Sequence, residues 1–206
     1  MSMNLFITAI GTDSGKSVIS AIITEALQAD YWKPVQSGQP RDTDFVKSLV
    51  SNPKTVFHQE AYCLTEPLSP HASAKIDGVS IELDKIRLPK TDNHLVIEGA
   101  GGMLVPLNDT SFVIDLADKL GAELILVANL YLGSINHTLL SIRELERRQA
   151  YQNFKVKGIV FNGTPTPESE RIILKHSPFP LLFNVIQEEK IDKKMVRRYA
   201  EKLQWF

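Results

Sequence analysis

The segment ITAIGTDSGKS, residues 7–17, ends in the Gly-Lys-Ser triplet of phosphate-binding loops. The standard loop has four residues between its first glycine and this triplet, whereas Gly11 leaves only three before Gly15. A predicted strand before the loop and a predicted helix after it would aim backbone N–H groups at phosphate oxygens. Lys16 would then reach the terminal phosphates of a nucleotide, and the Ser17 hydroxyl would bind Mg²⁺. The alternative is an ordinary turn between a strand and a helix.

A lysine follows the next short apolar stretch, in WKPVQSG at 32–38. Pro34 has a fixed φ and favours an extended conformation for Lys33, which would help to aim the lysine side chain. Lys33 could stabilise an anion that develops during a reaction. A solvated surface lysine is the alternative.

Acidic residues occur in two further segments, RDTDF at 41–45 and HLVIEGAGG at 94–102. Either Asp42 or Asp44 could bind the metal, since Mg²⁺ at a triphosphate takes one or two carboxylates; an aspartate that caps a helix is the alternative. Glu98 ends an apolar strand, where a buried acid needs a partner. A carboxylate opposite the loop lysine is typical of phosphoryl-transfer sites.

Strands and helices alternate along the chain, which predicts the scaffold that positions these residues. Apolar runs predict strands at 3–10, 31–35, 94–98, 123–130, 156–162 and 180–185. Helical spacing predicts helices at 17–29, 42–50, 112–121, 136–150, 167–175 and 190–203. We therefore expect an α/β fold with a mostly parallel sheet, helices on both faces and ligands at the carboxyl ends of the strands. Residues 51–93 are expected to form an elaborated irregular connection.

Composition excludes several classes of partner. The chain has 23 Lys and Arg against 24 Asp and Glu, so its formal charge of −1 gives no reason to expect nucleic acid or an anionic membrane surface. The N-terminus has no signal-peptide pattern, and no apolar run approaches the ~20 residues of a membrane-spanning helix. These features predict a cytoplasmic protein. The single cysteine, Cys63, is expected to be a small buried residue.

Five motifs, in order across most of the chain, resemble those of the dethiobiotin synthetase family: GTDSGKS (11–17), KPVQSG (33–38), EPLSPH (66–71), EGAGG (98–102) and LGSINH (132–137). The family's phosphate loop is itself longer than the standard one, with five residues between a leading small residue and Gly15. Ala9 takes the leading position, where glycine is usual. If that position needs a conformation that only glycine adopts easily, the loop must be shifted locally.

The resemblance implies a P-loop NTPase-like α/β fold, in a single domain over residues 1–206, and a homodimer with the substrate site at its interface. It also implies ATP, Mg²⁺, CO₂ or bicarbonate, and 7,8-diaminopelargonate as ligands. The family carboxylates one substrate amine to a carbamate and transfers the ATP γ-phosphoryl group to it. Attack by the second amine closes the cyclic urea and yields dethiobiotin, ADP and phosphate.

The resemblance also implies roles for individual residues. Lys16 and Lys33 would be catalytic and contact the phosphates and the carbamate. The metal would be bound by Ser17, Asp44 and Glu98. The substrate would be bound by Thr12 and Ser37 at its amine end, and by Ser134, Ile135 and Asn136 of the other subunit at its carboxylate. ATP would be bound by Asp13, Ser14, Gly15, Lys16, Ser17, Val18, Asp44, Glu98, Gly99, Ala100, Gly101, Asn162, Gly163, Ile186, Gln187 and Glu188.

Some positions leave a structural alternative or depart from the family. Asn136 and His137 could simply cap a helix, and His71 could support the substrate pocket or be structural. Val185 and Ile186 stand where the family has Ile-Pro next to the adenine.

Other functions on the same scaffold compete with this interpretation. A partition-type ATPase switch shares the fold and the irregular loop, but residues 9–11 lack its signature lysine. An amidating ligase of the cobyrinic-acid type needs a glutaminase domain with its own cysteine. A nucleotide-binding protein without chemistry would not need Lys33 and Ser37 together.

Overall fold

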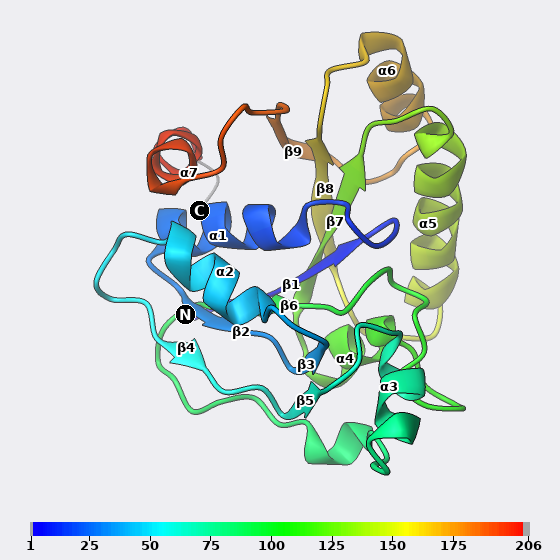
Figure 1. Cartoon of the computed structure of the whole chain (residues 1–206). Helices are drawn as coiled ribbons and strands as arrows, with labels where there is room; N and C mark the ends of the chain where they lie inside the picture. Colours follow the sequence, from blue (N-terminus) through cyan, green and yellow to red (C-terminus); the bar gives the residue numbers. More distant parts are fainter. Residues whose placement is uncertain (1, 204–206) are drawn as a thin grey trace.

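A twisted sheet of seven strands forms the centre of the molecule (Figure 1), in a computed structural model that describes residues 2–203. In spatial order its strands are β4 (Phe57–His58), β2 (Asp30–Trp32), β6 (Leu95–Glu98), β1 (Asn4–Ala9), β7 (Glu123–Asn129), β8 (Val156–Asn162) and β9 (Leu181–Val185). Every neighbouring pair is parallel. The strands β3 (Val35–Ser37) and β5 (Tyr62–Leu64) form a second, two-stranded parallel sheet.

Helices cover both faces of the main sheet (Figure 1). One face carries the packed helices α1 (Lys16–Leu27), α2 (Asp42–Leu49) and α7 (Lys193–Ala200). The other carries α4 (Val113–Lys119) and α5 (Ser134–Gln149), with α6 (Pro167–Lys175) packed against α5. Helix α3 (Pro70–Ile76) and the 3₁₀ helix η1 (Leu83–Lys85) belong to the connection before β6. No helix in residues 2–203 is both long and apolar enough to cross a bilayer.

Two hydrophobic cores lie on opposite faces of the sheet, because side chains alternate along each strand. In β1, Leu5 and Ile7 belong to the core beneath α1, whereas Phe6 belongs to the core beneath α4 and α5. All three side chains are fully buried. A strand buried on both faces is apolar along its whole length, as the sequence pattern indicated. The predicted α/β fold with a mostly parallel sheet is confirmed; its exact extent over 1–206 stays a prediction, since residues 1 and 204–206 lie outside the described part.

The predicted strand 31–35 is wrong in one respect: the chain leaves the main sheet after Trp32 and enters the second sheet at Val35. Pro34 lies between the two strands, where its missing N–H cannot interrupt a ladder. The Pro34 carbonyl instead accepts hydrogen bonds from Ala61 and Tyr62. After this break, Gln36 and Ser37 line a cavity at the carboxyl ends of the strands.

The connection at 51–93 is more regular than predicted, because it contains β4, β5, α3 and η1. Strands of two and three residues are too short to show a period in the sequence. Helix boundaries also differ slightly from those predicted. Helix α5 begins two residues earlier, at Ser134, and α7 begins at Lys193, where the Asp192 carboxylate caps the Met195 N–H at 2.9 Å.

Candidate active site

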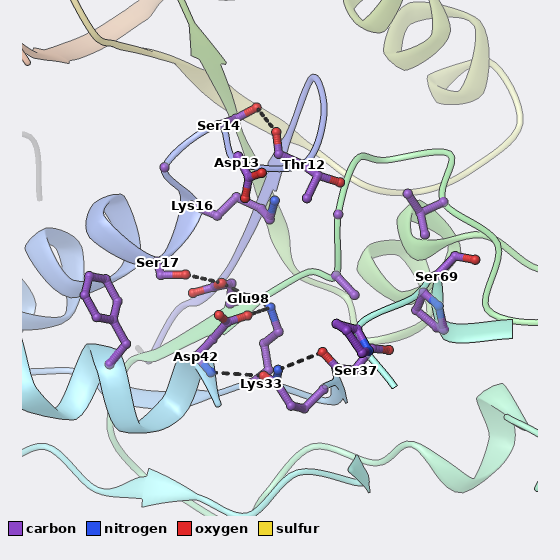
Figure 2. Close-up of a pocket in the computed structure, with 18 of the residues that line it drawn as sticks. Thr12, Asp13, Ser14, Lys16, Ser17, Lys33, Ser37, Asp42, Ser69 and Glu98 are labelled. Atoms are coloured by element: carbon purple, nitrogen blue, oxygen red, sulfur yellow. Dashed lines mark hydrogen bonds and ion pairs between the residues drawn. The ribbon is translucent and has the colours of Figure 1, made fainter. Parts of the chain in front are cut away.

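A cavity of about 720 Å³ opens at the carboxyl ends of the central strands (Figure 2). This is the edge at which parallel α/β sheets collect ligands. Polar and charged side chains from five separate segments meet there. The lining residues are Thr12, Asp13, Ser14, Gly15, Lys16, Ser17, Val18, Lys33, Gln36, Ser37, Pro40, Asp42, Phe45, Pro67, Leu68, Ser69, Pro70, Glu98, Ala100, Gly101 and Val105.

The loop from β1 to α1 has the tight backbone of a phosphate-binding turn. Gly15 precedes the helix with φ 88°, and a Cβ there would lie 2.2 Å from the Asn162 amide nitrogen, so this position requires glycine. Asp13 also has a positive φ, of 56°. The Ser14 hydroxyl donates to the Gly11 carbonyl at 3.0 Å, and Asn162 Nδ2 donates to the Ser14 carbonyl at 3.0 Å. The loop is therefore held open in front of the helix N-terminus.

Ala9 causes no distortion of this loop. It is the last residue of β1 and pairs in register with Val127 of β7, so its backbone is extended, a conformation that does not require glycine. The left-handed conformations occur further along, at Asp13 and Gly15. Position 9 does not require glycine, so the loop does not need the local shift that was expected in that case.

Glu98, at the end of β6, is the electrostatic centre of the cavity and is 1% exposed. Its Oε1 accepts hydrogen bonds from Ser17 Oγ at 2.8 Å and Lys33 Nζ at 3.1 Å, and its Oε2 accepts one from the Tyr31 hydroxyl at 3.0 Å. Burial favours a higher pKa for this carboxyl, but the charges of Lys33 and Lys16 together with these donors hold the pKa below its usual value. Glu98 is thus a buried carboxylate with the partners that the sequence predicted it must have.

Lys33 is also buried, at 3% exposure, so the alternative of a solvated lysine is wrong. Its Nζ lies 2.5 Å from an Asp42 carboxylate oxygen and 3.1 Å from Glu98, and it donates to the Gly99 carbonyl at 3.2 Å. Burial by itself lowers the pKa of this ammonium, but the adjacent Glu98 and Asp42 charges raise it above its usual value. Lys33 is therefore a fixed positive charge at the floor of the cavity.

Lys16 provides a second cation with different properties. Its Nζ donates to the Gly11 carbonyl at 3.4 Å. Burial and the nearby charge of Lys33 lower its pKa from 10.5 to about 8. A polyanion bound in the cavity would oppose both effects and favour the charged form of Lys16.

Of the two acids on α2, Asp42 rather than Asp44 lines the cavity, which favours Asp42 between the two candidates for the metal. The Asp44 side chain is 56% exposed and forms an ion pair with Arg41, at 2.9 Å. Residues two positions apart on a helix point in directions about 200° apart, so both acids cannot face the same site. Asp42 begins the helix and reaches Lys33, whereas Asp44 points to solvent.

Most of the other predicted residues of the phosphate and amine region line the cavity: Thr12, Asp13, Ser14, Gly15, Val18, Ser37, Ala100 and Gly101. Gly99 lies behind this lining and contributes its carbonyl to Lys33. The Ser37 hydroxyl is buried and has no hydrogen-bond partner among the described residues, so it is available to a ligand.

The two segments predicted to contact adenine lie together beyond the main cavity, at the ends of β8 and β9. The Gly163 N–H donates to the Val185 carbonyl at 2.9 Å and so joins them. Gln187 accepts a hydrogen bond from Thr164, and Glu188 is paired with Arg198. Asn162 connects this region to the phosphate loop through Ser14.

The residues predicted to bind the substrate carboxylate, Ser134, Ile135 and Asn136, form the first turn of α5 and do not line the main cavity. A second cavity of about 340 Å³ lies nearby and shares Thr12 and Val105 with the first. It is lined by Ile10, Gly11, Thr12, Gly102, Met103, Leu104, Val105, His137, Leu140, Ser141 and Glu144. The three residues therefore lie outside both cavities.

Sequence reasoning missed Tyr31 and Gln36. Tyr31 donates to Glu98, and Gln36 lines the cavity and accepts the Asp42 N–H at 3.1 Å. A signal for Tyr31 was present, since residues two apart in an extended chain share a face and Tyr31 precedes Lys33 by two.

The expectation that Cys63 is buried was wrong, because its side chain is exposed on β5.

The oxygen donors of the cavity suit a hard divalent cation that is shared with phosphates. Among residues 2–203 no group of three or more His, Cys, Asp and Glu side chains is arranged to hold a metal without further ligands. Ser17, Glu98 and Asp42 provide a hydroxyl and two carboxylates around the same space. Mg²⁺ typically binds through one or two carboxylates together with substrate phosphates and water.

Comparisons with known proteins agree with this geometry. A family profile described as "AAA domain" matches residues 3–195. The ATP-dependent dethiobiotin synthetase BioD of Cytophaga hutchinsonii is 58% identical over 96% of this chain and 95% of its own. The chain belongs to the dethiobiotin synthetase family. The enzyme of the same name from Christiangramia forsetii is 46% identical over 98% of this chain and 96% of its own.

The similar solved structures support the P-loop fold alone. A ParA family ATPase from Chlorobium tepidum superposes with a TM-score of 0.62, at 12% identity, over 98% of this chain and 99% of its own. A putative plasmid partition protein from Borrelia burgdorferi, bound to AMPPNP, superposes with a TM-score of 0.55 at 13% identity, over 100% and 92%. Family membership, the P-loop fold and the assignment to an ATP-dependent ligase family are thus confirmed.

Proposed function

We propose that this member of the dethiobiotin synthetase family converts 7,8-diaminopelargonate, CO₂ and ATP to dethiobiotin, ADP and phosphate. A carbamate forms first, from one amine and CO₂. A carbamate oxygen then bonds to the γ-phosphorus as the bond to ADP breaks. The second amine attacks the carbamate carbon, phosphate leaves, and the released protons pass to solvent. The observation that carries the proposal is the buried, charged Lys33 held opposite Lys16 in one cavity.

The two lysines suit this chemistry because each reactant is an anion. Joining a carbamate to a triphosphate brings like charges together, and fixed cations lower the free energy of that transition state. Lys16 is adjacent to the phosphate loop, and Lys33 rises from the floor between Glu98 and Asp42 (Figure 2). We assign the phosphates to Lys16 and the carbamate to Lys33.

Mg²⁺ would be bound by Ser17, Glu98 and Asp42, with Asp42 in the role first expected of Asp44. When bound, the cation would neutralise charge on the phosphates. The protein's own contribution is Lys33, whose ammonium contacts both carboxylates and so links them. Its positive charge offsets the negative charge of both acids.

Separate groups of residues would bind the substrate amines, the substrate carboxylate and the adenine. Thr12 and Ser37 would contact the amines, supported by the unpartnered Ser37 hydroxyl. The adenine would lie at residues 162–163 and 186–188. The first turn of α5 would bind the carboxylate in the other subunit of a homodimer, since Ile135 and Asn136 are exposed and helix N-termini favour anions. The cytoplasmic location also remains a prediction.

One assay tests the function directly. The protein is incubated with ATP, Mg²⁺, bicarbonate and 7,8-diaminopelargonate, and ADP release is compared with and without the diamine. We expect the diamine to accelerate ADP release and dethiobiotin to appear in equal amount. Equal hydrolysis in both samples would contradict the synthetase and favour a partition-type ATPase switch. Nucleotide binding without hydrolysis would favour a non-catalytic protein.

A further inference from the structure

Tyr31 is a polar residue in the centre of the core beneath α1. It lies in β2, its side chain is fully buried, and its ring packs 5.9 Å from that of Phe57. A buried phenol hydroxyl needs a hydrogen-bond partner, and that of Tyr31 is Glu98 Oε2 at 3.0 Å. The tyrosine therefore connects the apolar core to the charged floor of the cavity.

The two oxygens of Glu98 have different partners. Oε1 accepts from Ser17 and Lys33, both of which line the cavity, whereas Oε2 accepts from Tyr31. The terminal torsion of a glutamate is broad and does not fix the plane of the carboxylate by itself. A donor on Oε2 removes this freedom and leaves Oε1 facing Ser17.

The strand geometry explains why Tyr31 can do this. Tyr31 pairs in register with Val96 of β6, and Glu98 is two residues further along that strand. Side chains two apart share a face, so Val96 and Glu98 both face α1. Tyr31 in the neighbouring strand β2 and Lys33, which directly follows that strand, reach the same carboxylate.

We propose that Tyr31 is a positioning residue that holds the Glu98 carboxylate in the orientation needed to bind a divalent cation together with nucleotide phosphates. The inference rests on the proposed function only in taking Glu98 as a metal-binding residue. Hydrogen-bond partners behind a metal ligand commonly affect metal affinity by about 10- to 100-fold. The proposed role of Tyr31 predicts an effect on metal binding that can be measured without the diamine substrate.

The direct test measures Mn²⁺ in place of Mg²⁺. Electron paramagnetic resonance gives the Mn²⁺ affinity of the protein with a non-hydrolysable ATP analogue, for the wild type, Tyr31→Phe and Tyr62→Phe. Tyr62 is a suitable control because it lies in β5 of the second sheet, and its hydroxyl accepts a hydrogen bond from the Glu82 N–H instead of donating one to Glu98. We expect Tyr31→Phe to weaken Mn²⁺ binding about tenfold and Tyr62→Phe to leave it unchanged. Unchanged binding in Tyr31→Phe, or no binding by the wild type, would overturn the proposal.

A double-mutant cycle separates positioning from a general effect on the fold. In a Glu98→Gln background, Tyr31→Phe should weaken Mn²⁺ binding no further. In the protein that retains Glu98, Tyr31→Phe should raise the Mg²⁺ concentration that gives half-maximal turnover, and kcat should recover at saturating Mg²⁺. Simple addition of the two effects on Mn²⁺ affinity would mean that Tyr31 does not act through Glu98.

A measurement on the wild type covers the case in which Tyr31→Phe does not fold. The protein is labelled with ¹³C at tyrosine Cζ, and the Tyr31 resonance is assigned by elimination with Tyr→Phe variants at the other four tyrosines. Adding Mg²⁺ to the nucleotide complex should shift this resonance, and a static resonance would contradict the proposal. Loss of diamine-dependent ADP release with normal Mn²⁺ binding would instead contradict only the proposed synthetase activity.

Discussion

Lys33 is a buried ammonium that remains charged because two carboxylates, Glu98 and Asp42, contact it. An isolated buried lysine would lower its pKa and lose its charge, so this pair of acids is what makes the residue useful in an anionic reaction. The same contacts make Lys33 part of the local structure. Removal of Lys33 leaves two acids without their cation and can therefore disturb the site. A loss of turnover identifies a catalytic role only if nucleotide binding is measured as well.

We expect Lys33→Ala to abolish diamine-dependent turnover and to leave ATP binding largely intact, because Lys16 and the loop still bind the phosphates. ADP release and the Kd for a non-hydrolysable ATP analogue measure the two effects separately. Turnover equal to that of the wild type would remove Lys33 from the catalytic residues.

The two acids of α2 offer a matched pair of variants. Asp42→Asn should lower turnover about 10- to 100-fold, since it removes a carboxylate from the cavity and a partner from Lys33. Asp44→Asn should change turnover little, because its exposed ion pair with Arg41 contributes only about 0–1 kcal/mol. Steady-state kinetics at saturating ATP and several Mg²⁺ concentrations distinguish them. The reverse order of effects would restore Asp44 as the metal-binding residue.

At the scale of elements, the end of α1 is tied to the chain that follows α2 by one carboxylate. Glu25 Oε2 accepts hydrogen bonds from the N–H groups of Ser51 at 2.8 Å and Asn52 at 3.0 Å and from the Asn52 side chain, and Oε1 accepts one from the Ser51 hydroxyl. Burial favours a higher pKa for Glu25, but these four hydrogen bonds lower it below its usual 4.5. The connection thereby fixes the position of α2, and with it that of Asp42.

This carboxylate makes stability depend on pH. The pKa of Glu25 is lower in the folded protein, so its contribution is complete above pH 4.5 and is lost as pH falls through the folded value. Glu25→Gln should lower the free energy of unfolding by about 1–3 kcal/mol at pH 7, and the difference from the wild type should shrink in acid. Urea unfolding at several pH values measures this. Glu168→Gln is the control, since that side chain is 82% exposed; an equal loss there would contradict the assignment.

At the scale of the whole molecule, the second cavity has an apolar rim that is open to solvent. Leu104 is 46% exposed and Leu140 is 61% exposed, and both line this cavity. Exposed apolar surface next to a functional cavity is typical of an interface. The proposed homodimer would cover this surface and would bring the first turn of one α5 to the substrate of the other subunit.

We therefore expect Leu140→Glu to shift the protein from dimer toward monomer and to raise KM for the diamine more than KM for ATP. Sedimentation velocity and steady-state kinetics provide the two measurements. Ile76→Glu, a similarly exposed position at the end of α3, should leave both unchanged. A wild-type protein that sediments as a monomer would contradict the dimer itself.

Local patterns in the sequence were sufficient for the alternation of strands and helices, the phosphate loop and Glu98, because periodicity, glycine and a buried charge are visible in a short stretch of chain. The local pattern left Lys33 open between a solvated and a functional lysine, and the family motifs were needed to favour the second. The break at Pro34 and the short strands β4 and β5 were not, since their pairing depends on distant segments. Only the tertiary structure showed that Asp42 rather than Asp44 lines the cavity, because the start of α2 sets the direction of each side chain. It alone showed that Ala9 is an ordinary strand residue and that Tyr31 contacts Glu98, since both facts depend on strand register between segments far apart in the sequence.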